Sequence, residues 1–159
     1  MKTRAITVDD VATLVELRIA LLEETGGALA SDVRDSLLRA NDAFFRTNLD
    51  SPAWKSWCVE AEGSVVAVGT LAFFDRPPYP GNIEGRDAYL LNMYTLPSHR
   101  GRGIATAIVQ DMLHYAQSRG VRKIVLHATD EGRRIYTKLG FVASSAYMEL
   151  AVEPNANTN

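Results

Sequence analysis

The chain has 159 residues, of which 47% are apolar and 23% are charged, and this is the size and balance of one globular domain with its own core. The formal net charge of -2 excludes a polycation that is drawn as a whole to nucleic acid. The N-terminal stretch lacks an apolar core of signal-peptide length, and no run approaches the ~20 apolar residues that span a bilayer. We therefore expect a soluble, cytoplasmic protein that binds neither membranes nor nucleic acid. The single cysteine, Cys58, agrees with a reducing compartment and is interpreted as a core residue.

The first half of the chain predicts a short strand, two helices and a strand hairpin. Thr7 and Asp10 resemble a capping box, and apolar residues then recur at helical spacing over 8–24. The TGGALAS run ends this helix, and Ser31 or Asp32 can cap a second helix that fades near position 48. The runs WCVEAEG and SVVAVGTLAFF are rich in β-branched and aromatic residues and flank a tight turn. They predict an antiparallel hairpin.

The second half of the chain alternates strands and helices. The expected elements are a strand over 87–96, a helix over 104–119, a strand over 123–129, a helix over 130–140 and one or two strands over 141–150. A single domain over 1–152 and a disordered tail over 153–159 complete the prediction. The pattern indicates an α/β (α+β) fold with a mixed sheet and helices on its faces.

A basic, glycine-rich corner, LPSHRGRGIAT, connects the strand over 87–96 to the helix after it. Such a turn presents unpaired backbone N–H groups at the positive end of the helix dipole, which suits an anion. Gly101 and Gly103 let the backbone approach an anion closely, and Arg100 and Arg102 can add charge-assisted contacts. The alternative is a solvated corner that only turns the chain.

Two common phosphate-binding motifs do not match this corner. A Walker loop requires a lysine after its final glycine, where this chain has Ile104, and a dinucleotide fingerprint requires a third small residue where Thr106 stands. The corner does meet the signature R/Q-x-x-G-x-G/A through Arg100, Gly103 and Ala105. With it, the chain resembles the GNAT superfamily of acyl-CoA-dependent N-acetyltransferases, in its small-molecule branch.

A second block strengthens this resemblance. GRRIYTKLGF, over 132–141, looks like the last core helix of the family and the turn after it. The resemblance implies a GNAT fold with a central mixed, mostly antiparallel sheet of six to seven strands flanked by four helices, in the order β-α-α-β-β-β-α-β-α-β-β. It also implies transfer of an acetyl group from acetyl-CoA to a small-molecule amine or peptide N-terminus, by direct attack in a ternary complex with CoA as product and no metal.

The resemblance places the cofactor site on the second half of the chain. Backbone amides of the corner would hold the pyrophosphate, and a backbone N–H in the strand before it would polarise the thioester carbonyl. The implied residues are Asn92, Met93, Tyr94, Thr95, Leu96, Arg100, Gly101, Arg102, Gly103, Ile104, Ala105, Thr106, Thr129, Gly132, Arg133 and Tyr136. Thr129 stands where many members have asparagine, and a hydroxyl replaces only part of that hydrogen bonding.

Tyr136 occupies the position of the family's general acid. A phenol has a pKa near 10, so it is still protonated at neutral pH and can give its proton to the leaving thiolate of CoA. Gly132 precedes it by one helical turn, so its missing side chain would leave room for the cofactor arm. The alternative for Tyr136 is a packing residue of an amphipathic helix.

The general base is left open by the sequence. Many members carry a glutamate in the region where this chain has Leu90 and Leu91. Glu84 or Asp87 before the strand, or His127 on the next strand, could serve through water, or the amine could arrive neutral. An ordinary half-exposed strand histidine is the alternative for His127.

The acceptor pocket is expected in the variable parts of the chain, with Glu23, Glu24, Tyr79 and Tyr147 as candidate residues. The two glutamates could hold a cationic amine, or they could be a solvated helix end. A second hypothesis for the whole chain is a non-catalytic acyl-CoA sensor or interaction module, which the missing strand glutamate favours. The sequence leaves a homodimer open.

Overall fold

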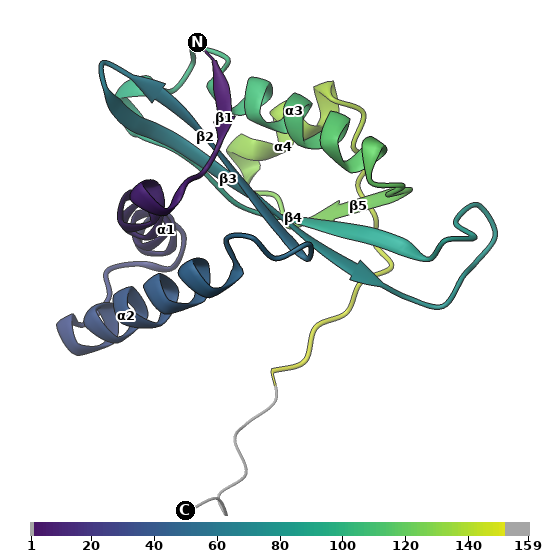
Figure 1. Ribbon diagram of the computed structural model, residues 1–159, viewed down its shortest axis with the longest axis horizontal. Helices are drawn as coiled ribbons and strands as arrows, with labels where there is room; N and C mark the ends of the chain where they lie inside the picture. Colours follow the sequence, from purple (N-terminus) through teal and green to yellow (C-terminus); the bar gives the residue numbers. More distant parts are fainter. Residues whose placement is uncertain (1, 152–159) are drawn as a thin grey trace, which may run out of the picture.

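The computed structural model describes residues 2–151, which form one mixed sheet with helices on both faces (Figure 1). The strands are β1 (Thr3–Ala5), β2 (Trp54–Ala61), β3 (Ser64–Asp75), β4 (Arg86–Thr95) and β5 (Lys123–Leu126). The helices are α1 (Val11–Gly26), α2 (Ser31–Asn48), α3 (Ile104–Ser118) and α4 (Asp130–Lys138), with single 3-10 turns at η1 (Val8–Asp10) and η2 (Pro97–His99). None of the helices within 2–151 is long and apolar enough to cross a membrane.

The sheet has the order β1-β2-β3-β4-β5. The first four strands pair antiparallel, which confirms the predicted hairpin of β2 and β3, and β5 pairs parallel with β4. The predicted tail over 153–159 lies outside the described residues.

The prediction of six to seven strands was wrong for the described residues, which form five. The difference lies in 141–150, where one or two strands were expected and no strand pairing occurs. Val142, Met148 and Leu150 of this segment are 87–97% exposed, so its apolar side chains have no packing surface within 2–151 that would offset the entropy cost of ordering a strand. The segment instead leaves α4 as an extended chain that passes β5 (Figure 1).

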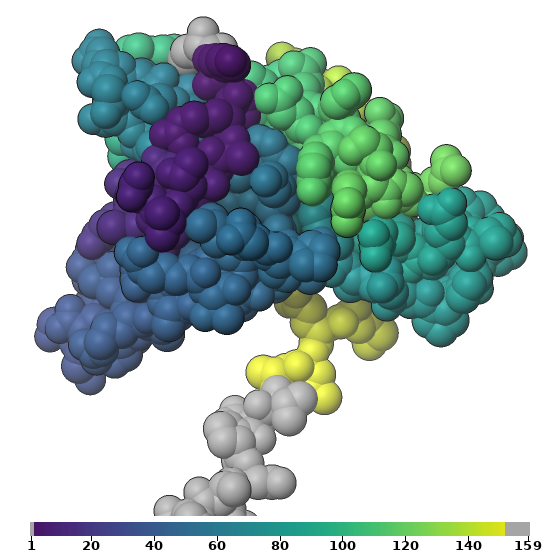
Figure 2. Space-filling model, in the orientation of Figure 1, coloured from purple at the N-terminus to yellow at the C-terminus, as the bar shows by residue number. Residues whose placement is uncertain are grey.

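The two faces of the sheet carry separate cores. α3 and α4 cover one face, where Ile108 and Met112 pack with Leu71 and Leu90 of the sheet. α1 lies on the opposite face, with Cys58 fully buried there as expected. Figure 2 shows α1 and α2 as a continuous blue and purple lobe, with the teal loop between β3 and β4 projecting at the far end. Only part of the sheet is therefore covered on the α1 side.

A bulge and a divergence open the sheet near its middle. The register of β3 with β4 shifts between Val68 and Thr70, and Asn92 on β4 has a left-handed backbone with φ of 56°. β5 pairs with β4 only as far as Leu90, opposite Leu126, whereas β4 continues to Thr95. Because the strands separate beyond this pair, backbone and side chains of β4 become available between them.

The start of the helical region is fixed by the predicted capping box. The Asp10 carboxylate accepts hydrogen bonds from the Thr7 amide and hydroxyl, each at 2.8 Å, and from Arg4 Nη1 at 2.6 Å. The hydrogen bond from Arg4 holds the pKa of Asp10 well below its usual range. η1 occupies the first turn, so α1 begins at Val11 rather than near position 8 as predicted.

We expect Asp10→Asn to lower the free energy of unfolding by about 1–3 kcal/mol at neutral pH, because the amide loses the charge-assisted bonds. A carboxyl whose pKa is lowered on folding stabilises above its unfolded pKa near 4, and this stability is lost as pH falls through the folded value. Urea unfolding from neutral to acid pH should therefore show a smaller acid loss for the variant. Asp42→Asn, at an exposed i,i+4 pair with Arg46, is the control and should change little. An equal acid loss in wild type and Asp10→Asn would contradict the assignment.

Candidate active site

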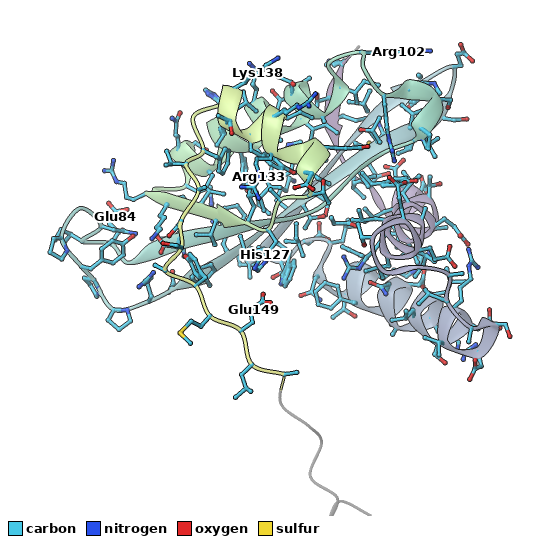
Figure 3. All side chains as sticks on the ribbon, turned by 180° about the vertical axis from the view of Figure 1, so that it is seen from behind. Glu84, Arg102, His127, Arg133, Lys138 and Glu149 are labelled. Carbon is cyan, nitrogen blue, oxygen red and sulfur yellow. The ribbon has the colours of Figure 1, made fainter. Side chains whose placement is uncertain are left out.

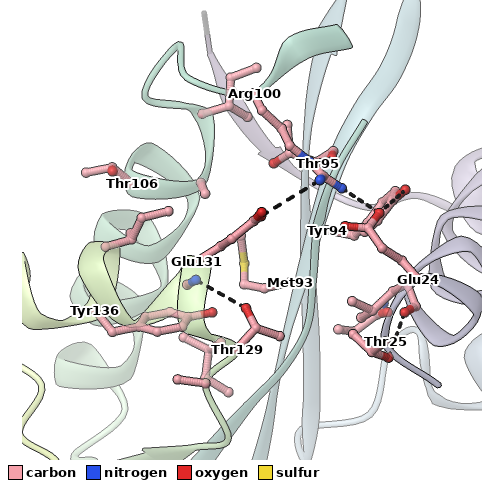
Figure 4. Close-up of a pocket in the computed structure, with 18 of the residues that line it drawn as sticks. Glu24, Thr25, Met93, Tyr94, Thr95, Arg100, Thr106, Thr129, Glu131 and Tyr136 are labelled. Atoms are coloured by element: carbon pink, nitrogen blue, oxygen red, sulfur yellow. Dashed lines mark hydrogen bonds and ion pairs between the residues drawn. The ribbon is translucent and has the colours of Figure 1, made fainter. Parts of the chain in front are cut away.

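A cleft of about 680 Å³ lies where β4 and β5 diverge. It is bounded by the end of α1, by β4, by the corner that starts α3, and by α4 (Figure 4). Its lining residues are Leu21, Leu22, Glu24, Thr25, Leu90, Leu91, Asn92, Met93, Tyr94, Thr95, His99, Arg100, Gly101, Gly103, Ile104, Ala105, Thr106, His127, Ala128, Thr129, Glu131, Gly132, Ile135 and Tyr136. The cleft thus brings together most of the residues that the sequence proposed for the cofactor.

The glycine-rich corner supplies backbone N–H groups to the cleft. Gly101 and Gly103 adopt left-handed backbones, with φ of 73° and 78°, and Gly103 caps the N-terminus of α3. A Cβ on either glycine would meet no atom within 4 Å. The amides of the first helical turn have no intrahelical acceptor and face an open approach. The Arg100 amide is already used, since it donates to the Pro97 carbonyl at 3.3 Å.

Arg100 joins the corner to the end of α1. Its Nη2 donates to Glu24 Oε2 at 2.7 Å, and its Nε donates to the Thr95 carbonyl at 2.9 Å. Tyr94 also donates to Glu24, at 3.2 Å, and its ring lies under the Arg100 guanidinium. The Arg100 hydrogen bond lowers the pKa of Glu24. On the other side of the cleft, Glu131 Oε2 lies 3.9 Å from Arg100 Nη1 (Figure 4).

Two polar residues of β4 that line the cleft have buried side-chain atoms without partners among the described residues. Asn92 is 4% exposed, and neither its side-chain nitrogen nor its oxygen has a hydrogen-bond partner among the described residues. The Thr95 hydroxyl is likewise buried without a partner there. Because buried polar groups are normally hydrogen-bonded, these atoms are suited to a polar ligand.

Tyr136 extends from α4 into the cleft (Figure 4). Burial raises the pKa of its phenol to about 12, so the hydroxyl is protonated at neutral pH. Its ring packs edge-on against Phe141, with centroids 5.6 Å apart. A Cβ on Gly132 would lie 3.0 Å from this ring and 3.2 Å from the Thr129 hydroxyl, which caps α4 by accepting from the Gly132 amide. The missing side chain of Gly132 therefore leaves room for the ring of Tyr136.

His127 lies at the opposite rim of the cleft from the corner. Its Nδ1 is hydrogen-bonded to the Tyr89 hydroxyl, and its Nε2 lies 3.0 Å from Glu149 Oε1. Figure 3 shows the Glu149 side chain directed toward His127 from the segment after α4.

The other candidate base residues lie outside the cleft. Glu84 is exposed on the loop between β3 and β4, beside Gly120 (Figure 3). Asp87 is 1% exposed and accepts hydrogen bonds from Arg76 at 3.1 Å, Asn82 at 2.8 Å and Tyr79 at 3.2 Å. This network anchors the loop, and it also accounts for Tyr79, which was a candidate for the acceptor pocket.

Five further candidates do not line the cleft. Glu23 pairs with Arg34 of α2 at 3.5 Å, and Arg102 donates to the Ser98 carbonyl at 3.1 Å on the outer side of the corner. The remaining three are Leu96, Arg133 and Tyr147.

Several residues at the cleft had no clear signal in the sequence. Leu21 and Leu22 come from α1, which is far away in the chain, and Glu131 stands in the first turn of α4. Thr25, next to the candidates Glu23 and Glu24, was expected near the acceptor pocket and does line the cleft. The acidic start of DEGRR could have drawn attention to Glu131, because acidic residues favour helix N-termini. Nothing local pointed to Glu149.

Comparison with known proteins gives the family of this chain. Residues 19–141 match the acetyltransferase (GNAT) family. A predicted acetyltransferase from Clostridium acetobutylicum, solved with acetyl-CoA, is 33% identical, with a TM-score of 0.82 over 94% of this chain and 95% of that chain. The chain therefore belongs to the GNAT acetyltransferase family, as the sequence resemblance predicted.

Two curated relatives are also similar to this chain. Glucosamine 6-phosphate N-acetyltransferase of Trypanosoma brucei brucei is 27% identical over 60% of this chain. Thialysine N-epsilon-acetyltransferase of Mus musculus is 27% identical over 57% of it. The matches span 63% and 51% of the lengths of these relatives.

Proposed function

We propose that this protein transfers the acetyl group of acetyl-CoA to a primary amine of a small molecule or peptide, by direct attack in a ternary complex. One observation carries the proposal: the Tyr136 hydroxyl and the free amides of the α3 N-terminus line a single cleft, opened where β4 leaves β5. Membership of the GNAT family and the acetyl-CoA of the Clostridium structure support it.

The residues present fit acetyl-CoA as the acyl donor. The amides at Gly101 and from Gly103 to Thr106 suit a pyrophosphate, because an anion is stabilised at a helix N-terminus. Asn92 and Thr95 offer buried polar atoms without partners to the pantetheine and thioester. When bound, acetyl-CoA supplies an activated acyl group and a thiolate leaving group.

Two side chains of the cleft are assigned to proton transfer. Tyr136 is the general acid that protonates the leaving thiolate, since burial keeps its phenol protonated. His127 is the base that accepts the proton of the acceptor amine, because it lines the cleft whereas Glu84 and Asp87 do not.

The charge of the cleft favours an acceptor without a phosphate. Among the described residues that line it, Arg100 is the only arginine or lysine. This guanidinium is paired with Glu24 and lies near Glu131. A diamine such as thialysine or lysine would meet complementary charge here, whereas the phosphate of glucosamine 6-phosphate would find no unpaired arginine or lysine among the described residues that line the cleft.

The test is release of CoA from acetyl-CoA, followed with a thiol reagent, in the presence of different amines. The panel is thialysine, lysine, glucosamine, glucosamine 6-phosphate and a peptide with a free N-terminus. We expect transfer to at least one amine, with kcat/KM about tenfold or more higher for diamines than for the sugar phosphate, since an unpaired phosphate loses one charge-assisted contact. Tight acetyl-CoA binding with no release above hydrolysis would instead support the non-catalytic sensor.

A further inference from the structure

Three side chains from separate parts of the chain form a hydrogen-bonded row beside the cleft. Tyr89 comes from β4, His127 directly follows β5, and Glu149 comes from the segment after α4. Only His127 has a role in the function proposed above. Tyr89 is partly buried, whereas the side chains of His127 and Glu149 are 68% and 79% exposed.

The chemistry of the two neighbours selects one tautomer of His127. A carboxylate only accepts hydrogen bonds, so Glu149 favours the tautomer with the proton on Nε2. The lone pair is then on Nδ1, where it accepts the hydrogen bond of the Tyr89 hydroxyl. Burial raises the pKa of Tyr89, which keeps this hydroxyl protonated. The arrangement parallels a catalytic triad, in which a carboxylate orients a histidine toward a hydroxyl.

Resting on the proposed function, we propose that Glu149 is the positioning residue that makes His127 a base, and that the Tyr89 hydroxyl delivers the proton of the acceptor ammonium to it. One N–H bond of the ammonium breaks and its proton goes to the Tyr89 oxygen, while the Tyr89 O–H proton moves to Nδ1. The products of this step are a neutral amine, with its lone pair free for attack, and an imidazolium. The Glu149 carboxylate stabilises the imidazolium, and the exposure of His127 lets the proton leave to water.

The pH dependence of this row depends on the charges near it. Tyr89 and Glu149 contact His127 directly. The other ionisable groups that line the cleft with it are Glu24, Tyr94, His99, Arg100, Glu131 and Tyr136. Of these, Glu24 and Arg100 largely neutralise each other.

The first test compares pH profiles of kcat/KM for the full chain and the variants His127→Gln, Tyr89→Phe and Glu149→Gln. We expect His127→Gln to lose about 100-fold at neutral pH, as removal of a general base does, and to recover at high pH, where the amine is neutral by itself. Tyr89→Phe should lose about tenfold or more for the same reason. Glu149→Gln should lose activity in the same pH range as His127→Gln, because the carboxylate no longer orients the ring of His127. Glu62→Gln, in the exposed β2–β3 turn, is the matched control and should follow the wild type.

A second measurement needs no turnover. Nitrogen NMR of the three histidines, with His127 assigned by its loss in His127→Gln, should show the Nε2–H tautomer of His127 in the wild type and less of that tautomer in Glu149→Gln. An active wild type whose pH profile and His127 tautomer are both unchanged by Glu149→Gln would overturn the role of Glu149. A wild type that transfers acetyl to no amine would overturn the proposed function and the relay with it, while the NMR result would still report the tautomer.

Discussion

Tyr136→Phe should reduce kcat by about 100-fold, the usual contribution of one general acid, while the dissociation constant of acetyl-CoA stays near that of the wild type. The substitution removes one oxygen and keeps the ring that packs against Phe141, so folding should be preserved. An acid loses activity as pH rises through its pKa. Because burial raises the pKa of Tyr136 to about 12, the wild-type kcat should show no fall from this group across the neutral range.

The measurement is steady-state turnover under conditions in which chemistry limits the rate, with acetyl-CoA affinity determined separately by calorimetry. Tyr115→Phe is the matched control. Tyr115 lies on α3, does not line the cleft, and packs edge-on against Trp57 of β2 and Phe73 of β3. It should retain wild-type turnover. Full activity of Tyr136→Phe would remove Tyr136 from the mechanism and leave the thiolate to be protonated by solvent.

Gly103→Val should weaken acetyl-CoA binding by about 100-fold or more, through strain and through obstruction of the corner. A β-branched residue at φ of 78° costs about 1–2 kcal/mol, and its side chain would occupy the open space through which the α3 amides face a phosphate. Two lost charge-assisted contacts of about 1.5–3 kcal/mol each are enough for this factor.

Gly63→Val separates the two causes. Gly63 lies in the β2–β3 turn with φ of 76°, and a Cβ there would meet no atom within 4 Å. Valine at this position therefore introduces the same backbone strain at a distance from the cleft. Thermal unfolding should report a similar loss of stability in both variants, and calorimetry should report weakened acetyl-CoA binding only in Gly103→Val. Equal acetyl-CoA affinity in the two variants would mean that the corner does not hold the pyrophosphate.

Elements with a long periodic pattern were predicted closely. The helix expected over 104–119 is observed over 104–118, and the strand expected over 87–96 is observed over 86–95. Short elements were less accurate, since the strand expected over 123–129 ends at Leu126, where the chain turns toward the cap of α4. The strand predicted over 141–150 was wrong because a strand forms only with a partner, and apolar content does not supply one.

The candidate site divides in the same way. The corner around Gly103 could be predicted because its chemistry is local: a left-handed glycine and a helix N-terminus are properties of consecutive residues. The sequence could not choose among the candidate bases Glu84, Asp87 and His127, because each has a side chain that can accept a proton. Only the tertiary structure shows that Glu84 lies on an exposed loop, Asp87 in a buried hydrogen-bond network and His127 at the rim of the cleft.

The sequence by itself determined the order of the elements as far as α4, the glycine-rich corner and the place of Tyr136 on α4, since each depends on periodicity or on neighbours within a few residues. The tertiary structure decided the rest. It joined Glu24 of α1 to Arg100 across 76 positions, brought Glu149 to His127, and opened the cleft by ending the pairing of β4 and β5 at Leu90 and Leu126. These contacts depend on how segments that are far apart in the chain pack together, and no local pattern of residues encodes that packing.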